Sequence, residues 1–153
     1  MTYDELLLQA DFEKLLVKEA PLLGNDGRIK GNRIAIRKDI PTLKQKSCVL
    51  AEELGHYYTS CGNILDQNFI ENRKQEQRAR VWAYNKLIGL TGIIKAYKAQ
   101  CHNKFEIAEF LDVTEEFLSE ALSYYKSKYG ICTGFEQYII YFEPSIGVFE
   151  TYK

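Results

Sequence analysis

Residues 49–58 read VLAEELGHYY, and this stretch decides how the chain should fold and where its chemistry should lie. Leu50 and Leu54 recur at helical spacing, and Thr42 with Gln45 forms a capping-box pattern just upstream. The pattern predicts a helix that runs to about residue 59 and stops in the glycine-bearing residues that follow.

Two side chains of this predicted helix suit a metal ion. Glu52 and His56 stand at i and i+4, so they project from the same face of the helix and can converge on one ion. Carboxylate and imidazole are both accepted zinc ligands. Glu53 occupies the place where the HExxH helix of zincins carries its general base.

Glu76 is the best candidate for a third ligand. It lies on the next predicted helix, with Ala79 and Ala83 at i+3 and i+7. Small residues there would let this helix approach the first one closely and aim the carboxylate at the metal. Arg80, one turn further on, offers the alternative of a surface ion pair with Glu76, and spacing alone does not choose between the two.

Two other potential ligands are excluded or disfavoured. Cys48 lies eight residues before His56, about 12 Å along a helix axis, which ligand bonds of about 2.0–2.3 Å cannot bridge. We expect a buried core thiol there. His102 falls in the probable loop CHNK and is expected to be solvated. Tyr57 and Tyr58 are weak candidates for oxyanion stabilisation.

The two predicted helices resemble those of the ImmA/IrrE family, in which a helix of the form (H/E)ELGH is followed by a helix of the form ExxAxxFA. Here EELGH at residues 52–56 precedes EQRARVWA at residues 76–83. The stretches GNRIAI (31–36) and SCVLA (47–51) also resemble family signatures, and the likeness covers about residues 1–90.

The resemblance implies a cytosolic metallo-endopeptidase that uses zinc or another divalent metal such as manganese. Glu52, His56 and Glu76 would be the metal ligands and Glu53 the catalytic base. Glu53 would take a proton from the water that attacks the peptide carbonyl. Relatives of this phage or mobile-element type act on helix-turn-helix repressors, so the implied substrate is such a repressor and the implied outcome is relief of repression.

Glu52 departs from the histidine of the common family pattern, although EELGH recurs among phage-type relatives. Two carboxylates and one imidazole cancel the charge of a divalent metal, so the centre should polarise its water less than one with two imidazoles. Without a metal, Glu52, Glu53 and Glu76 would crowd negative charge together. Either a cation or nearby arginines such as Arg78 and Arg80 must then neutralise them.

The rest of the chain predicts an α+β fold: a mostly helical zincin-like core with a small antiparallel sheet, then a helix-turn-helix or winged-helix-like part. The core (residues 1–90) should contain a helix at 3–12, an edge strand at 15–17, strands within 25–36 and a helix from Asn68, with Glu71 at capping-box distance, to residue 87. Gly89 and Gly92 should interrupt the chain before a short helix at 93–99.

The C-terminal part (residues 91–153) should pack on the core as two helices around a tight turn, the second capped by Thr114, followed by a hairpin. It does not look like a DNA reader. The start of its second helix carries Glu115 and Glu116, and then Glu120, which a phosphate backbone would repel. We therefore expect a structural or protein-docking element.

Composition narrows the function classes further. The net charge of −1 over 153 residues argues against a protein whose main task is binding nucleic acid. No apolar run approaches the roughly 20 residues that span a bilayer, and the first residues do not form a secretory signal. The four cysteines form no CxxC pair, so we expect reduced thiols in a cytosol.

Two functions of different classes remain open. The first is the metal-dependent endopeptidase that cleaves a repressor. The second is a catalytically silent regulatory module that binds a repressor or a toxin–antitoxin partner without cutting it. Glu52 keeps the second hypothesis open, whereas the retention of Glu53, His56 and Glu76 favours the first.

Overall fold

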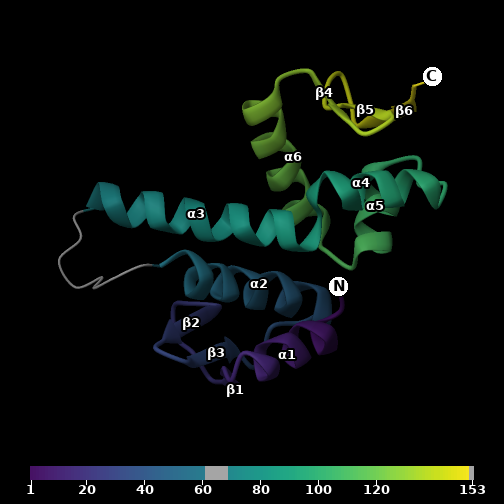
Figure 1. Cartoon of the computed structure of the whole chain (residues 1–153). Helices are drawn as coiled ribbons and strands as arrows, with labels where there is room; N and C mark the ends of the chain where they lie inside the picture. The colour runs from purple at the N-terminus through teal and green to yellow at the C-terminus, as the bar shows by residue number, and fades with distance from the viewer. Residues whose placement is uncertain (61–68, 152–153) are drawn as a thin grey trace. The chain divides into compact units, whose positions relative to one another are not determined.

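A computed structural model of the chain describes residues 1–60 and 69–151, with the side chains of residues 72 onward in its third helix. The fold is mixed α+β, as expected, with six helices and six short strands among the described residues (Figure 1). It divides into two compact units, Met1–Ala83 and Tyr84–Lys153, which are described separately. None of the described helices is long and apolar enough to cross a membrane.

The first unit surrounds a three-stranded sheet. In chain order it contains α1 (Tyr3–Phe12), β1 (Leu16–Ala20), β2 (Gly27–Lys30), β3 (Arg33–Arg37), α2 (Leu43–Thr59) and most of α3 (Phe69–Leu87). The strand order is β1-β3-β2, so both β1 and β2 are edge strands.

The sheet is mixed, which corrects the prediction of an antiparallel one. β2 and β3 form the expected antiparallel hairpin, but β1 pairs with β3 in parallel. The reason is topological: β3 lies between β1 and β2, which run in opposite directions, so one of its two pairings must be parallel. Single-strand periodicity carries no information about this choice.

The predicted start of α2 is confirmed in detail. Thr42 accepts a hydrogen bond from the backbone N–H of Gln45, whose side chain accepts in turn from the N–H of Thr42. Leu50 and Leu54 are fully buried, as is Ile36 of β3. The predicted stop at residues 61–63 and the predicted start at Asn68 with Glu71 lie outside the described residues or side chains.

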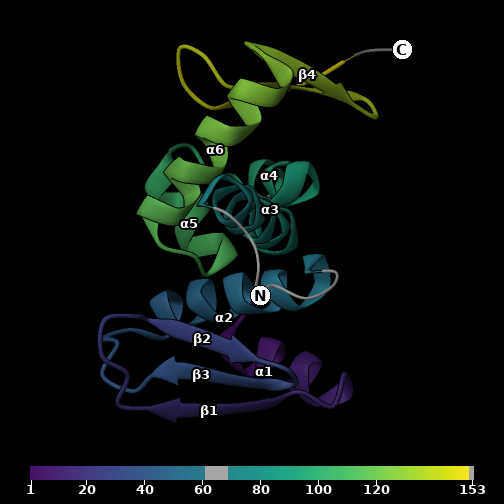
Figure 2. The same cartoon turned by 90° about the vertical axis from the view of Figure 1, so that its left-hand side faces the viewer.

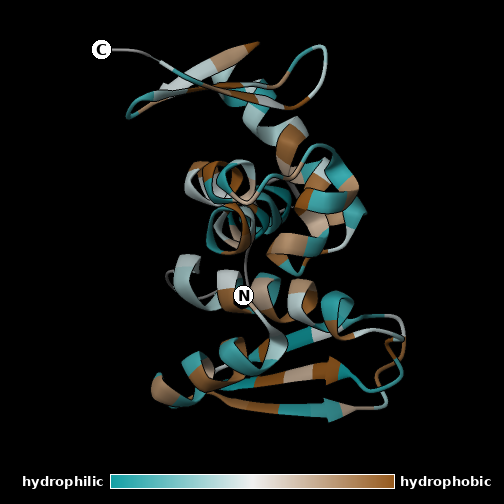
Figure 3. Ribbon diagram, turned by 90° about the vertical axis from the view of Figure 1, so that its right-hand side faces the viewer, coloured by the Kyte–Doolittle hydropathy of each residue, from teal (hydrophilic) through white to brown (hydrophobic). Residues whose placement is uncertain are grey.

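Figures 2 and 3 view the first unit from opposite sides. In Figure 3, α1 lies in front of the sheet, and in Figure 2 the other face of the three strands is uncovered. α1 packs on both α2 and β1. Among the described residues, helices therefore cover only one face of the sheet.

The second unit contains α4 (Gly89–Lys98), α5 (Lys104–Leu111), α6 (Glu115–Tyr129), β4 (Cys132–Phe135), β5 (Tyr138–Tyr141) and β6 (Gly147–Glu150). The break before α4 falls at Gly89, whose φ of +61° favours glycine. The prediction that Gly92 also interrupts the chain is wrong, because Gly92 is buried inside α4. The predicted helix at 93–99 accordingly begins at residue 89.

The helix pair around the tight turn is present. Thr114 caps α6 by accepting a hydrogen bond from the N–H of Phe117 at 3.0 Å, as predicted. The hairpin is part of a three-stranded antiparallel sheet of order β4-β5-β6. The extra strand, β4, contains Gly134 and shows too little apolar alternation to be recognised in the sequence.

Candidate metal centre

Helices α2 and α3 of the first unit touch through their backbones. A Cβ atom built on Gly55 would lie 2.3 Å from the carbonyl oxygen of Ala79, so no larger residue fits at position 55 without moving a helix. Ala79 and Ala83 are both fully buried. The small residues thus bring the helices together, as the spacing predicted, and carry the polar residues beside them into contact.

His56 and Glu76 meet at this crossing. His56 Nε2 lies 3.3 Å from Glu76 Oε1; the histidine side chain is 18% exposed and the glutamate side chain 60%. Two donors on a tetrahedral zinc, with bonds of about 2.0–2.1 Å, stand about 3.3–3.4 Å apart. The spacing therefore fits two ligands of one ion as well as a direct ion pair. The alternative partner, Arg80, forms no ion pair with Glu76 in the described part of the chain.

Glu53 holds a proton more tightly than an ordinary carboxylic acid. Its pKa is raised from 4.5 to about 7, mainly by burial and in addition by the negative charges of Glu52 and Glu76. The carboxylates do crowd together, as the sequence predicted. Arg78 and Arg80 are exposed and form no ion pair with them among the described residues. A pKa near neutrality suits a group that accepts and returns a proton at physiological pH.

Glu52 is the least defined member of the set. It is half-buried and close enough to Glu53 to raise the pKa of that residue, but it is not joined to His56 and Glu76 in one cluster. Within residues 1–60 and 69–151, no three His, Cys, Asp or Glu side chains stand ready to hold one ion. The structure thus brings two of the three predicted ligands together, and the third requires a change of side-chain position.

A model of the family described as Peptidase_M78, the IrrE N-terminal-like domain, matches residues 11–123. The chain belongs to this family. The family is one of metallopeptidases, and the match covers both helices of the candidate centre and most of α6 in the second unit. No curated protein and no solved structure matches the chain.

The IrrE-like chain contains a residue at this site that the sequence did not single out. Gly27 of β2 lies against α2: a Cβ atom there would stand 2.9 Å from Glu53 Oε1 and 2.7 Å from Val49 Cγ1. The edge strand β2 therefore runs directly beside Glu53. A glycine at the start of a strand pattern was a visible signal, but only the fold shows what approaches it.

Gln75 is a second residue that sequence analysis missed. It is 5% exposed, and its Nε2 donates a 2.7 Å hydrogen bond to Ser60 Oγ, the residue that ends α2. A buried amide that binds the neighbouring helix end fixes α3 next to Glu76. No sequence pattern marks Gln75, because glutamine is ordinarily an exposed residue.

The two tyrosines after the EELGH stretch form an aromatic group with α3. The Tyr58 ring stacks on the Trp82 ring, with 4.9 Å between the ring centres. The Tyr57 ring contacts the Tyr58 ring edge-on, with 5.0 Å between the centres. Burial raises the pKa of Tyr58, whose hydroxyl lies near Gln9 and Glu13 of α1. That position directs the Tyr58 hydroxyl to α1.

The two other potential metal ligands of the sequence, Cys48 and His102, are not part of this site. Cys48 is buried, as predicted, and His102 is exposed in a loop, as predicted; none of Cys48, Cys101 and Cys132 forms a disulfide with another described residue. A hollow of about 510 Å³ beside Glu76 is lined by Asn72, Arg73, Gln77 and Arg80.

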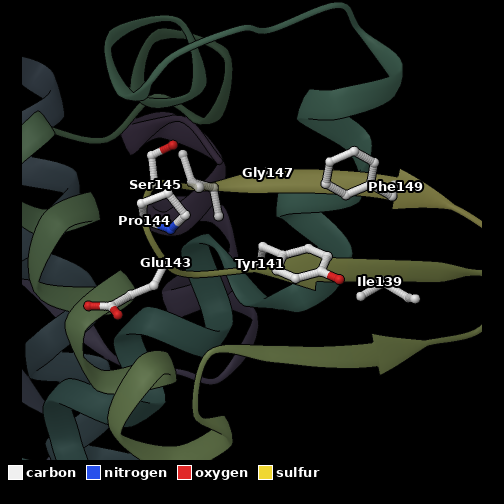
Figure 4. A pocket seen from close by; sticks show the side chains of 8 residues that line it. Ile139, Tyr141, Glu143, Pro144, Ser145, Gly147 and Phe149 are labelled. Atoms are coloured by element: carbon white, nitrogen blue, oxygen red, sulfur yellow. The ribbon is translucent and has the colours of Figure 1, made fainter.

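The second unit has its own hollow of about 540 Å³, on β5 and β6 (Figure 4). Its lining is mostly apolar, and its one carboxylate, Glu143, pairs with Lys126.

Proposed function

We propose that the chain is a metal-dependent endopeptidase whose metal is held between α2 and α3. His56 and Glu76 would be two of the ligands and Glu52 the third, with zinc as the first choice of metal and manganese as the second. The observation that carries the proposal is the 3.3 Å approach of His56 Nε2 to Glu76 Oε1 beside a buried glutamate. Membership of a metallopeptidase family supports it.

In this proposal the residues of the site have separate roles in the reaction. A bound divalent metal would act as a Lewis acid on the peptide carbonyl and make water more acidic. Glu53 takes a proton from the attacking water onto its carboxylate and returns it to the amide nitrogen as that group leaves. The edge strand β2, held against Glu53 at Gly27, borders the path of the substrate.

The substrate we propose is a helix-turn-helix repressor of the same phage or mobile element, cleaved in the cytosol to relieve repression. Support for this finer statement comes from the family resemblance of residues 52–56 and 76–83. The α5–α6 pair and its following sheet, a winged-helix-like arrangement in this proposal, would serve to dock the repressor. Glu115 and Glu116 at the start of α6 still argue against DNA as its ligand.

The proposal is tested by a cleavage assay with purified, zinc-loaded protein and the repressor encoded beside it. We expect cleavage at one or few bonds, and a loss of at least about 100-fold in the Glu53→Gln variant, since a positioned general base contributes that much or more. Full proteolytic activity in Glu53→Gln would remove Glu53 from the mechanism. Cleavage that persists in His56→Ala and Glu76→Ala would remove the metal site.

One observation favours the silent regulator as the second candidate. Glu52 replaces the common histidine and does not join His56 and Glu76 in a ready cluster within the described residues. A chain that binds the repressor tightly, takes up no metal and leaves the repressor intact would establish this alternative.

A further inference from the structure

The uncovered face of the first sheet carries a group of positive charges. Side chains alternate along a strand, so Arg28 and Lys30 of β2 project to the face opposite to that of Gly27. Gly27 faces Glu53 and α2. Arg28 and Lys30 must therefore project from the other face, the one that Figure 2 shows uncovered.

The register of the strands adds two more cations to that face. Lys30 stands directly opposite Arg33 of β3. Ala35 of β3 stands opposite Arg28 on one side and opposite Lys18 of β1 on the other. We call these four cations, Lys18, Arg28, Lys30 and Arg33, the basic face.

No described residue neutralises the charges of the basic face. All four residues are exposed, and none forms an ion pair within the described part of the chain. Arg37, on the same side of β3, does form ion pairs, with Asp26 at 3.1 Å and with Asp39 at 3.2 Å. The sheet can thus pair its cations with acids, and at four neighbouring positions it does not.

This arrangement is unfavourable for the free protein. Like charges directly opposite on neighbouring strands destabilise a sheet, and Lys30 and Arg33 are such a pair. An ordinary solvated surface intersperses both signs of charge. Like charges placed side by side with no stabilising contact in return point to a function of this surface.

We propose that the basic face docks an acidic segment of the protein substrate. The inference rests on the proposed peptidase function, because β2 joins the two places: its first residue lies against Glu53, and its next residue belongs to the basic face. A polypeptide that enters the site beside β2 would reach these cations within a few residues. Acidic side chains flanking the cleaved bond would then favour binding.

A protein segment fits this surface better than nucleic acid does. Binding to DNA requires neutralising many phosphates, and the chain as a whole has a net charge of −1. Glu53, which lies against Gly27 of the same strand, and the nearby Glu52 and Glu76 would also repel a continuous phosphate backbone. A short acidic segment can contact the four cations without meeting these carboxylates.

The test measures binding without cleavage, in full-length Glu53→Gln protein. The probes are a fluorescent glutamate homopeptide, a glutamine homopeptide of equal length and an oligothymidylate of equal charge. The test variant adds Arg28→Glu and Arg33→Glu. The control adds Lys95→Glu and Lys104→Glu, which make the same charge change at exposed positions in the second unit. Arg33→Glu places an acid opposite Lys30, so thermal stability should not fall.

We expect the glutamate peptide to bind in a salt-dependent manner, the glutamine peptide not to bind, and the test variant to lose at least about tenfold in affinity while the control does not. Equal losses in test and control variants would overturn the proposal, because the effect would then be one of net charge. Tighter binding of oligothymidylate than of the glutamate peptide would replace it by a nucleic-acid surface. Since no step requires cleavage, these results stand even if the chain is not a peptidase.

Discussion

Two helix contacts in this chain, one in each unit, are built around a glycine, and they differ in what the glycine meets. At the α2–α3 contact, a Cβ on Gly55 would lie 2.3 Å from a backbone oxygen of Ala79. At the α4–α5 contact, a Cβ on Gly92 would lie 3.4 Å from the tip of the Leu111 side chain. A side chain can move aside, whereas a helix backbone cannot, so only the first contact fixes the distance between its helices.

The same difference appears in how each unit treats a buried polar group. In the second unit the Tyr125 hydroxyl accepts a hydrogen bond from the Gly89 N–H at 3.2 Å and donates one to Asn85 at 2.9 Å. In the first unit the partly buried Glu53 lies beside two further carboxylates. The Tyr125 hydroxyl is thus satisfied by hydrogen bonds, whereas Glu53 stays in an unfavourable position next to the contact of α2 and α3, where a metal would be held in our proposal.

The largest expected difference in stability is between alanine variants of the two glycines. Gly55→Ala should lower the free energy of unfolding by about 3 kcal/mol or more, because the methyl group meets backbone. Gly92→Ala should change it by less than about 1 kcal/mol, since the Leu111 tip can yield and alanine favours a helix. Urea unfolding followed by circular dichroism measures both. Equal effects of the two substitutions would remove the distinction between the contacts.

The raised pKa of Glu53 predicts that the free energy of unfolding changes with pH by about 2–3 kcal/mol. Its folded-state pKa of about 7 lies above the ordinary value of 4.5, so between these pH values the folded state holds a proton that the unfolded state has lost. The stability of the metal-free protein should therefore fall as the pH rises from about 4.5 to about 7, and the penalty should persist above that range.

Glu53→Gln removes this penalty. The variant should be more stable than wild type by about 2–3 kcal/mol at pH 8 and no more stable at pH 4, where both states carry the proton. Unfolding at the two pH values in a chelator measures the difference, with the exposed Glu150→Gln as a control. A gain that is the same at both pH values would contradict the burial of Glu53.

The smallest expected losses of stability come from removing single buried side chains that form hydrogen bonds. Gln75→Leu loses its bond to Ser60, and Tyr125→Phe loses its bonds to Gly89 and Asn85. Each should cost about 1–2 kcal/mol of stability. Only Gln75→Leu should also weaken metal binding, because Gln75 holds α3 beside Glu76. Equal metal affinity in the two variants would show that Gln75 has a structural role alone.

Much of this molecule was predictable from local patterns. The Thr42–Gln45 capping box marked the start of α2, and the alanines after Glu76 marked the close approach of α3. These signals are local because capping and small-residue contacts depend on residues three or four positions apart.

The parts that could not be predicted depend on distant segments. The parallel pairing of β1 with β3 follows from the path of the chain, and the approach of Gly27 to Glu53 follows from that sheet. The burial of Gln75 depends on where α2 ends. The basic face likewise appears only when the register is known, because its four cations are distributed over three strands.

Calorimetric titration of zinc into metal-free protein tests the central claim most directly. The wild type should bind about one ion, His56→Ala and Glu76→Ala should each lose at least about tenfold in affinity, and His102→Ala, which removes the exposed histidine, should match the wild type. No zinc or manganese binding by the wild type, or equal binding by His56→Ala and His102→Ala, would contradict a metal centre between α2 and α3.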